Sequence, residues 1–464
     1  NGVAFDVNYS TVETVTSNVT ATNLTINNSG NAGDTVNLGA SVFAASTSMA
    51  NVNYQIADKT NITVRALGLS NLNLSDSILL TNGDLTITAN AINDTRVDTT
   101  ASLISANRLV LDGVNQMGNA TNGMTTDVSE LSVINHSGEI YLIEQDTTTQ
   151  DGIELIDISN STGVIAVSTD TGSITSTANL QTSGALNLTA AADIRLSGSN
   201  ELSGVLTLNG STVNVNNRTA TSLASVNADD LTITSRGSII SSGAIVVNNN
   251  TATALARLTS TTGSITLDNA DNNFDIVTLQ AANDASLVES GEITIRETAA
   301  GGALNISSNG NMLVGDLTAE TMTLQSDSGA IVDASSFLAA STVTLSAASG
   351  IGGGTVSHVS GSEGFDNLDT SGAINTQTAT LSAINTTSGT VNINNSGELN
   401  VRDLRNRGDI ILKNSGDILL QATQGSGALI GAIDANYGGN TSSSVYAGSV
   451  VILNESANSV RTAG

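Results

Sequence analysis

The chain has 464 residues with no Pro, Cys or Trp, and only 2% of them are aromatic. Without cysteine, a disulfide framework and a thiolate metal site are excluded. The formal net charge of -28 disfavours nucleic acid and anionic membranes as partners, because both are bound through Lys and Arg. Aliphatic residues still keep the hydrophobic share at 39%, which predicts a packed core built from small side chains rather than a disordered chain.

Neither end carries a recognisable targeting signal. The chain begins NGVAFDVNYS, without an initiating Met or a signal peptide, and it ends SANSVRTAG, without an anchor sequence. No apolar run reaches the ~18 residues that would predict a membrane-spanning helix. We therefore expect a processed chain or a fragment of a longer one, with no membrane span.

Short runs of alternating apolar and polar residues recur along the chain and predict strands. Clear examples are LTI at 85–87, LNL at 186–188, IRL at 194–196, VLTL at 205–208, VNV at 213–215, LTI at 231–233, ITL at 265–267, LNI at 304–306, MTL at 322–324 and VTL at 343–345. Gly, Ser, Asn and Asp clusters separate them, and helical periodicity is absent from the pattern. All-β structure is the prediction.

The spacing between similar strands predicts how they are arranged. Leu186 precedes Leu206 by 20 residues, and Ile194 precedes Val213 by 19. A period of roughly 19–21 residues carrying two or three short strands is typical of a right-handed parallel β-helix, also called a β-solenoid. Dividing the chain by that period gives about 23 coils. Stacked Asn side chains are expected to form hydrogen-bonded ladders along the axis.

One nine-residue phrase returns four times: INHSGEIYL from Ile134, LVESGEITI from Leu287, INNSGELNV from Ile393 and LKNSGDILL from Leu412. Gly reaches backbone conformations that other residues avoid, so its Ser–Gly pair predicts a corner between strands. The residues after the corner alternate, so every second one is expected in the core. The corner predictions are Gly397 and Gly416, and the core predictions are Leu399, Val401, Ile418 and Leu420.

The organisation predicted from this pattern is a single continuous solenoid over residues 1–464. Because the ends of solenoids are atypical, residues 1–40 and 425–464 are candidate capping or stacking ends. Residues 43–60, 112–130 and 352–370 break the repeat, and we expect longer loops or distorted coils there.

Three stretches resemble the repeats of filamentous-haemagglutinin-like exoproteins, a family of large β-strand-repeat bacterial adhesins. They read GSITLDNADNNFDIVTLQAANDASLVESGEITI at 263–295, RGSIISSGAIVV at 236–247 and DSGAIVDASSFLAASTVTLSAASGIGG at 327–353. The resemblance implies a right-handed parallel β-helix, secretion to the cell exterior and a role as an adhesin or surface fibre. The secretion domain of that family carries an Asn-Pro-Asn-Gly motif, which a chain without Pro cannot contain.

Candidate chemistry is sparse. Asp268, Asp271 and Asp275 could supply the two carboxylates of a polysaccharide hydrolase, but turn positions are the preferred interpretation, and we expect no enzyme activity. Glu398 and Asp417 occupy the same repeat position in successive coils. They are therefore weak candidates for a Ca²⁺ site, against the alternative of a solvated mixed-charge face. No other cofactor is expected.

Histidine and glycosylation give two further expectations. Taking Val288, Asn394 and Lys413 as the counterparts of His136 predicts a tolerant surface position, and His358 is the other histidine. Asn-x-Ser/Thr triplets mark possible attachment sites for glycans on surface residues. They include Asn18, Asn23, Asn61, Asn93, Asn187, Asn217 and Asn305.

The function predicted from these patterns is that of an extracellular structural or adhesive β-solenoid of a bacterial surface. It would act as a stiff rod or as a subunit stacked head to tail on copies of itself, or it would contact cell-surface or matrix components. One alternative is a glycan- or receptor-binding adhesin module that displays the three irregular segments. A less favoured alternative is a polysaccharide-degrading β-helix enzyme.

Overall fold

The computed structural model describes most of the chain in many short ranges. These are residues 14–16, 23–28, 35–38, 42–45, 51–53, 61–66, 71–80, 82–96, 102–145, 152–159, 161–248, 253–357, 367–421, 423–425, 428–430, 433–435, 450–454 and 459–462. The chain divides into two compact units, residues 1–228 and residues 229–464. The arrangement of one continuous solenoid over residues 1–464 stays a prediction.

The described residues contain strands and no helix, so the all-β prediction is confirmed. The strands of unit 1 are β1 (Thr14–Thr16), β2 (Asn23–Asn28), β3 (Thr35–Leu38), β4 (Val42–Ala45), β5 (Asn51–Asn53), β6 (Asn61–Ala66), β7 (Asn71–Leu74), β8 (Ile78–Leu79), β9 (Asp84–Thr88), β10 (Ala91–Asp94), β11 (Ile104–Asp112), β12 (Gln116–Met117), β13 (Met124–Ile134), β14 (Glu139–Glu144), β15 (Gly152–Ser159), β16 (Val164–Thr169), β17 (Ser173–Ser176), β18 (Gln181–Thr182), β19 (Leu186–Thr189), β20 (Ile194–Leu202), β21 (Val205–Asn209), β22 (Thr212–Asn217) and β23 (Thr221–Ala228).

Unit 2 is built in the same way from short strands. They are β24 (Asp230–Ser235), β25 (Ile239–Ser241), β26 (Ile245–Val247), β27 (Leu255–Ser260), β28 (Ile265–Leu267), β29 (Asn273–Phe274), β30 (Ile276–Ala281), β31 (Ala285–Glu289), β32 (Ile293–Ile295), β33 (Thr298–Ala300), β34 (Ala303–Ser308), β35 (Met312–Thr318), β36 (Thr321–Ser326), β37 (Ile331–Ala339), β38 (Thr342–Ala347), β39 (Thr355–Ser357), β40 (Asn367–Asp369), β41 (Ile374–Gln377), β42 (Thr380–Asn385), β43 (Val391–Asn395), β44 (Leu399–Arg405), β45 (Ile410–Asn414), β46 (Ile418–Leu420), β47 (Thr423–Gly425), β48 (Ala428–Ile430), β49 (Ile433–Asp434), β50 (Val450–Asn454) and β51 (Val460–Thr462).

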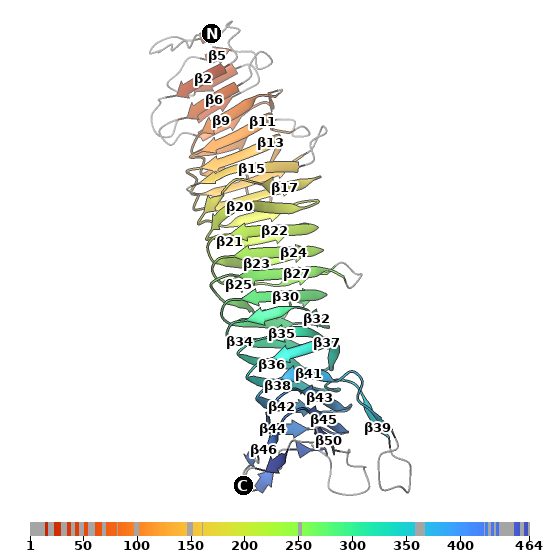
Figure 1. The fold of residues 1–464 in the computed structure, drawn as a ribbon. Coiled ribbons are helices and arrows are strands. Elements are labelled where there is room, and N and C mark those ends of the chain that lie inside the picture. The colour runs from red at the N-terminus through yellow and green to blue at the C-terminus, as the bar shows by residue number, and fades with distance from the viewer. Residues whose placement is uncertain are drawn as a thin grey trace. The chain divides into compact units, whose positions relative to one another are not determined.

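Within each unit, strands pair in parallel with their counterparts one coil later (Figure 1). Leu186 is opposite Leu206, Ile194 opposite Val213, and Leu399 opposite Ile418, as the repeat spacing predicts. Coils recur about 21 residues apart, and the predicted β-solenoid is confirmed. The described part of the chain makes about 16 turns, against the 23 coils predicted from the whole length of the chain.

Successive coils stack their apolar residues into columns in the interior. In unit 2, Leu304, Met322 and Val343 are opposite one another, and each is at most 1% exposed. Strand alternation places Thr323 and Thr344 on the outward face. The hydrophobic effect holds the columns together, and burying an aliphatic side chain stabilises the fold by about 1.5–3 kcal/mol.

The three segments that interrupt the repeat are only partly irregular. Most of 112–130 is strand, because β12 and β13 leave only 118–123 outside the coil. In 352–370, β39 and β40 form an antiparallel pair that projects from the stack of unit 2 (Figure 1). In 43–60, β4 and β5 pair antiparallel. The candidate capping ends, 1–40 and 425–464, lie largely outside the described residues.

We expect Leu324→Ala to lower the free energy of unfolding by about 2–5 kcal/mol, because it leaves a cavity in a closed column. Leu324 is 0% exposed. The matched change Thr323→Ala, on the outward face of the same strand, should cost less than about 1 kcal/mol. Urea unfolding followed by circular dichroism measures both variants. Equal losses would contradict the assignment of the two faces.

Candidate functional site

A buried polar side chain ends the strand before the Ser–Gly corner of the repeated phrase. At this position Asn395 is 2% exposed and Asn414 is 1% exposed. Asn395 Oδ1 accepts hydrogen bonds from the Thr378 backbone N–H at 3.0 Å and the Thr376 hydroxyl at 2.8 Å. Its Nδ2 donates to Asn414 Oδ1 at 2.8 Å in the next coil. The side chain thus pairs backbone and hydroxyl groups that the strands leave unpaired, since unpaired buried polar groups are costly.

Glu289 occupies the same position in the LVESGEITI phrase and is 2% exposed. Its Oε2 accepts the backbone N–H of Phe274 at 3.0 Å, and its Oε1 accepts that of Gly291 at 3.0 Å. Burial raises the pKa of Glu289 to about 7, although the hydrogen bonds from Gly291 and Phe274 act in the opposite direction. The carboxyl group therefore changes its protonation state near neutral pH.

His136 is buried, so the prediction of a tolerant surface position is wrong. Its side chain lies in the interior with the residue 1% exposed, and neither ring nitrogen has a hydrogen-bond partner among the described residues. Aligned on the Ser–Gly corner, its counterparts are Glu289, Asn395 and Asn414, one position later than those assumed from the sequence. Burial lowers the pKa of His136, and the nearby backbone of Gly138 offsets this only in part. His358 lies outside the described residues.

Glycine is required at the corners for two different reasons. Gly397 has a φ of +100°, which residues with a Cβ rarely adopt. Gly416 has no such conformation, but a Cβ there would collide with the backbone of Gly397 in the preceding coil. In unit 1, Gly184 and Gly204 are likewise packed directly on the carbonyl oxygens of the glycines one coil earlier.

The predicted core residues of the phrase are placed as follows. Leu399 is 2% exposed, Val401 0% and Ile418 1%, whereas Leu420 is partly exposed. Leu420 is the last residue of the short strand β46, and of that strand only Ile418 is buried.

Glu398 and Asp417 lie on adjacent coils, since Leu399 and Ile418 are opposite each other. Both are exposed. Asp417 Oδ1 accepts the backbone N–H of Ser459 at 2.7 Å, and this hydrogen bond lowers the pKa of the carboxyl group. No cluster of three or more metal-ligating side chains occurs among the described residues. A Ca²⁺ ion between the two carboxylates stays a prediction.

The other acidic candidates support local structure. Asp268 Oδ1 accepts the Ser286 hydroxyl at 2.7 Å, and Asp275 Oδ2 accepts the Ala254 N–H at 3.3 Å. Asp271 is exposed in a turn, and its N–H donates to Asn269 Oδ1 at 2.9 Å. The carboxylates of Asp268 and Asp275 thus serve contacts with other segments of the stack, whereas Asp271 contributes its backbone N–H to the turn.

Two polar hollows lie beside segments that interrupt the repeat. One, of about 370 Å³ in unit 1, borders the 118–123 excursion and is lined by Ile92, Asn93, Asp94, Arg96, Gln116, Gly118, Asn119, Asn122, Gly123, Met124 and Thr125. The other, of about 190 Å³ in unit 2, borders the end of the β39–β40 segment and is lined by Asp333, Thr370, Gly372, Ala373, Asn375, Asn392, Asn394 and Lys413. A third, of about 390 Å³, is lined mainly by hydroxyl side chains near Gly184.

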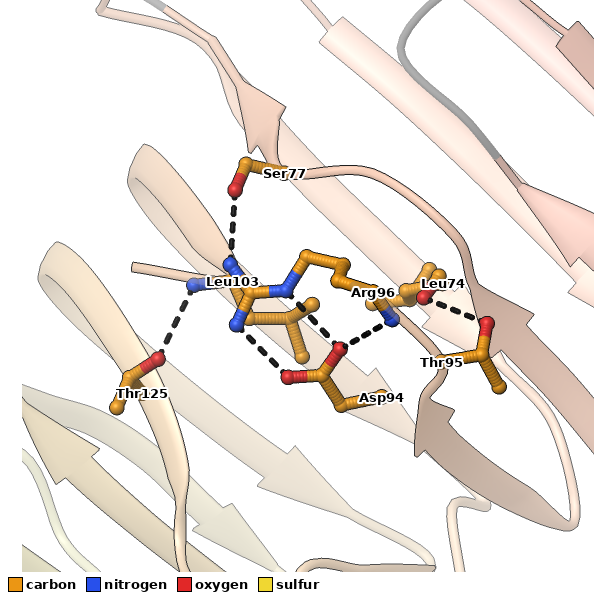
Figure 2. A network of polar contacts seen from close by, with 7 residues as sticks. All are labelled: Leu74, Ser77, Asp94, Thr95, Arg96, Leu103 and Thr125. Carbon is orange, nitrogen blue, oxygen red and sulfur yellow. Dashed lines mark hydrogen bonds and ion pairs between the residues drawn. The ribbon is translucent and has the colours of Figure 1, made fainter. Parts of the chain in front are cut away.

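An ion pair stabilises the wall of the hollow in unit 1 (Figure 2). The Arg96 side chain is only 4% exposed. Its Nη2 donates to Asp94 Oδ2 at 2.7 Å, its Nε to Asp94 Oδ1 at 3.0 Å, and its Nη1 to the Ser77 hydroxyl at 2.8 Å. Burial opposes ionisation of Asp94, but the hydrogen bonds and charge of Arg96 outweigh it and lower the pKa of Asp94.

The candidate glycosylation sites differ in exposure. Asn217 is 1% exposed and its Nδ2 donates to Leu202 O at 3.0 Å, so its amide is not accessible. Asn305 and Asn23 are exposed, and Asn61, Asn93 and Asn187 are partly exposed. Asn18 lies outside the described residues.

Sequence reasoning missed Arg96 and Glu289. Both are charged, and charged side chains are expected at the surface. The signal for Glu289 was its place in the repeated phrase, where it aligns with Asn395 and Asn414. The signal for Arg96 was the nearby Asp94, two residues earlier, which supplies a local bidentate partner.

Comparisons with known proteins leave the family open. No family model matches the chain. No curated protein and no solved structure matches it either. The resemblance to haemagglutinin-like exoproteins therefore stays an expectation. The described residues contain no helix, and so none that could span a membrane.

We expect Glu289 to make unit 2 less stable as the pH rises. Its folded pKa of about 7 exceeds the ordinary value of 4.5, so its contribution to stability is complete below about 4.5. It is lost as the pH rises through about 7, by an amount on the order of 3 kcal/mol. Urea unfolding at pH 5 and pH 8 measures this loss of stability. Glu289→Gln should remove the difference between the two pH values. The control Glu292→Gln, at an exposed position, should retain it. Identical pH dependence in all three proteins would contradict the assignment.

We expect His136 to make the protein less stable as the pH falls, which is the opposite of the effect of Glu289. Its folded pKa lies below the ordinary 6.5, so its contribution to stability is complete above that pH and is lost as the pH falls through the folded value. His136→Asn supplies the residue found at the equivalent positions 395 and 414, and it cannot become charged. We expect this variant to lose less thermal stability than the wild type between pH 7.5 and pH 5. A larger loss in the variant would show that the imidazole does not carry the effect.

Proposed function

We propose that this chain is an extracellular structural or adhesive β-solenoid of a bacterial surface, related to the haemagglutinin-like exoproteins. One observation carries the proposal: the residues that repeat most strictly are used to stack one coil on the next. Leu399 and Ile418 continue an apolar column, Asn395 bonds to Asn414, and Gly416 packs on Gly397. The most strictly repeated residues of this chain are thus the ones that hold successive coils together in a stiff stack.

End-to-end assembly is one way such a chain would work. Within the described residues, β50 pairs only with β45, and β51 pairs only with β46. Val450 is 42% exposed and Val460 46%. A strand edge with no partner among the described residues can pair with another chain, so a second copy is the partner we propose. The net charge of -28 favours solubility and would make divalent cations helpful for close approach.

A second candidate function is binding of a glycan or a receptor. It is favoured by the two polar hollows that border the 118–123 excursion and the β39–β40 segment, because binding residues are often carried on loops held by a rigid scaffold. In this function the stack displays the site and the excursions supply the contacts.

Electron microscopy of the purified chain over a range of concentrations tests the assembly proposal. We expect filaments with an axial repeat of about 4.8 Å in diffraction, which is the spacing of hydrogen-bonded strands. A chelator should shorten or dissolve them if Glu398 and Asp417 share a cation, and Glu398→Gln should then abolish that sensitivity. Single particles at every concentration would refute assembly and leave a stalk or display role to be tested by adhesion assays.

A further inference from the structure

An asparagine ladder in unit 1 ends at the hollow lined by Asn93. Asn73 Nδ2 donates to Asn37 Oδ1 at 3.3 Å, and Asn93 Nδ2 donates to Asn73 Oδ1 at 2.9 Å. Each coil thus donates to the coil before it and offers its own Oδ1 to the coil after it. At Asn93 the series stops, because no described donor reaches Asn93 Oδ1.

The ladder stops because the chain leaves the coil at that point. Ala91 is opposite Gln116 and Ile92 is opposite Met117, so the residue that follows over Asn93 is Gly118, which has no side chain to donate. The next coil confirms the detour, since β14 pairs first with β12 and then with the start of β13. Residues 118–123 therefore lie outside the stack, beside the open acceptor.

The excursion has a defined conformation. Asn119 Oδ1 accepts the N–H groups of Thr121 and Asn122, both at 3.0 Å, and the Thr121 hydroxyl at 2.8 Å. Gly118 has a φ of +70°, and a Cβ there would lie 2.7 Å from the Tyr141 carbonyl oxygen. The loop thus packs closely against β14 and forms one wall of the hollow.

Two side-chain amides of the hollow are uncharged and available. The side-chain amides of Gln116 and Asn122 line it, both residues are exposed, and neither amide has a protein partner among the described residues. The guanidinium of Arg96 is already held by Asp94 and Ser77. Ile92 and Met124 supply apolar surface between these groups.

We propose that this hollow binds a neutral saccharide. Two free amides each offer a donor and an acceptor, which suits vicinal hydroxyl groups, and Asn93 Oδ1 takes a further hydroxyl that continues the ladder. Anionic sugars are disfavoured, because the only cation lining the hollow, Arg96, is already paired with Asp94 and the chain carries a net charge of -28. The inference rests on the second candidate function and is independent of the assembly proposal.

Titration calorimetry of the full chain with three probes tests the proposal: maltotriose, chitotriose and trigalacturonate. We expect at least one neutral trisaccharide to bind and trigalacturonate not to bind. The double variant Gln116→Ala/Asn122→Ala should weaken binding about tenfold, since it removes two hydrogen bonds. The matched control Asn227→Ala removes an exposed ladder asparagine that bonds to Asn209 elsewhere in the same unit, and it should bind like the wild type.

Three results would overturn the proposal. They are no binding of either neutral probe, binding of trigalacturonate as tight as that of the neutral sugars, and binding that the double variant leaves unchanged. Circular dichroism of each variant shows that it is folded. Electron microscopy of the same samples reports on assembly separately, so a failed saccharide site and a failed scaffold role give different results.

Discussion

The structure depends on how backbone polar groups are satisfied where each coil turns. Along the strands, neighbouring coils bond to one another, but at a corner the chain changes direction and N–H groups lose their regular partners. Short polar side chains take over. Asp193 Oδ1 accepts the Thr212 N–H at 3.1 Å, Asp284 Oδ1 the Ala303 N–H at 2.8 Å, and Asn311 Oδ1 the Ala330 N–H at 3.0 Å. This need explains why a chain with a largely apolar interior is still rich in Asn, Ser, Thr and Asp.

The register of the coils could be predicted from the sequence, because residues that lie opposite each other in successive coils recur at a regular spacing. Leu186 and Leu206 share both spacing and surroundings, and the structure places them opposite each other. Burial of His136 and Glu289 could not be predicted as easily. Glu289 follows the buried Leu287 by two positions, which is an inward phase of the strand, but its polarity favours the surface. His136 follows the partly exposed Ile134, so strand alternation does not place it in the interior. A comparison aligned on the Ser–Gly corner carries the information, because it places them with two asparagines that build the interior.

The candidate site arises from an interruption of the repeat, whereas the stack arises from the repeat itself. A hollow forms where six residues are added to a coil, so the repeat pattern contains no trace of it beyond its own interruption. The irregular composition of 112–130 predicted a disturbance, yet it could not reveal that Asn93 and Gln116 border the same space. Their proximity depends on the pairing of β10 with β12, which only the three-dimensional structure supplies. Scaffold and site are thus separable features, and each can change without the other.

The short separation between paired strands bears on how the chain reaches its fold. Leu186 finds Leu206 only 20 residues away, and the same is true of the pairs on either side, whatever the length of the whole chain. Closing such a loop costs little entropy, and each finished coil is a template for the next. A β-sandwich must instead bring together strands that are distant in sequence, which slows its folding. The solenoid can grow from any nucleus by adding neighbours, so the time needed to complete it scales with the number of coils rather than with a search over the entire chain.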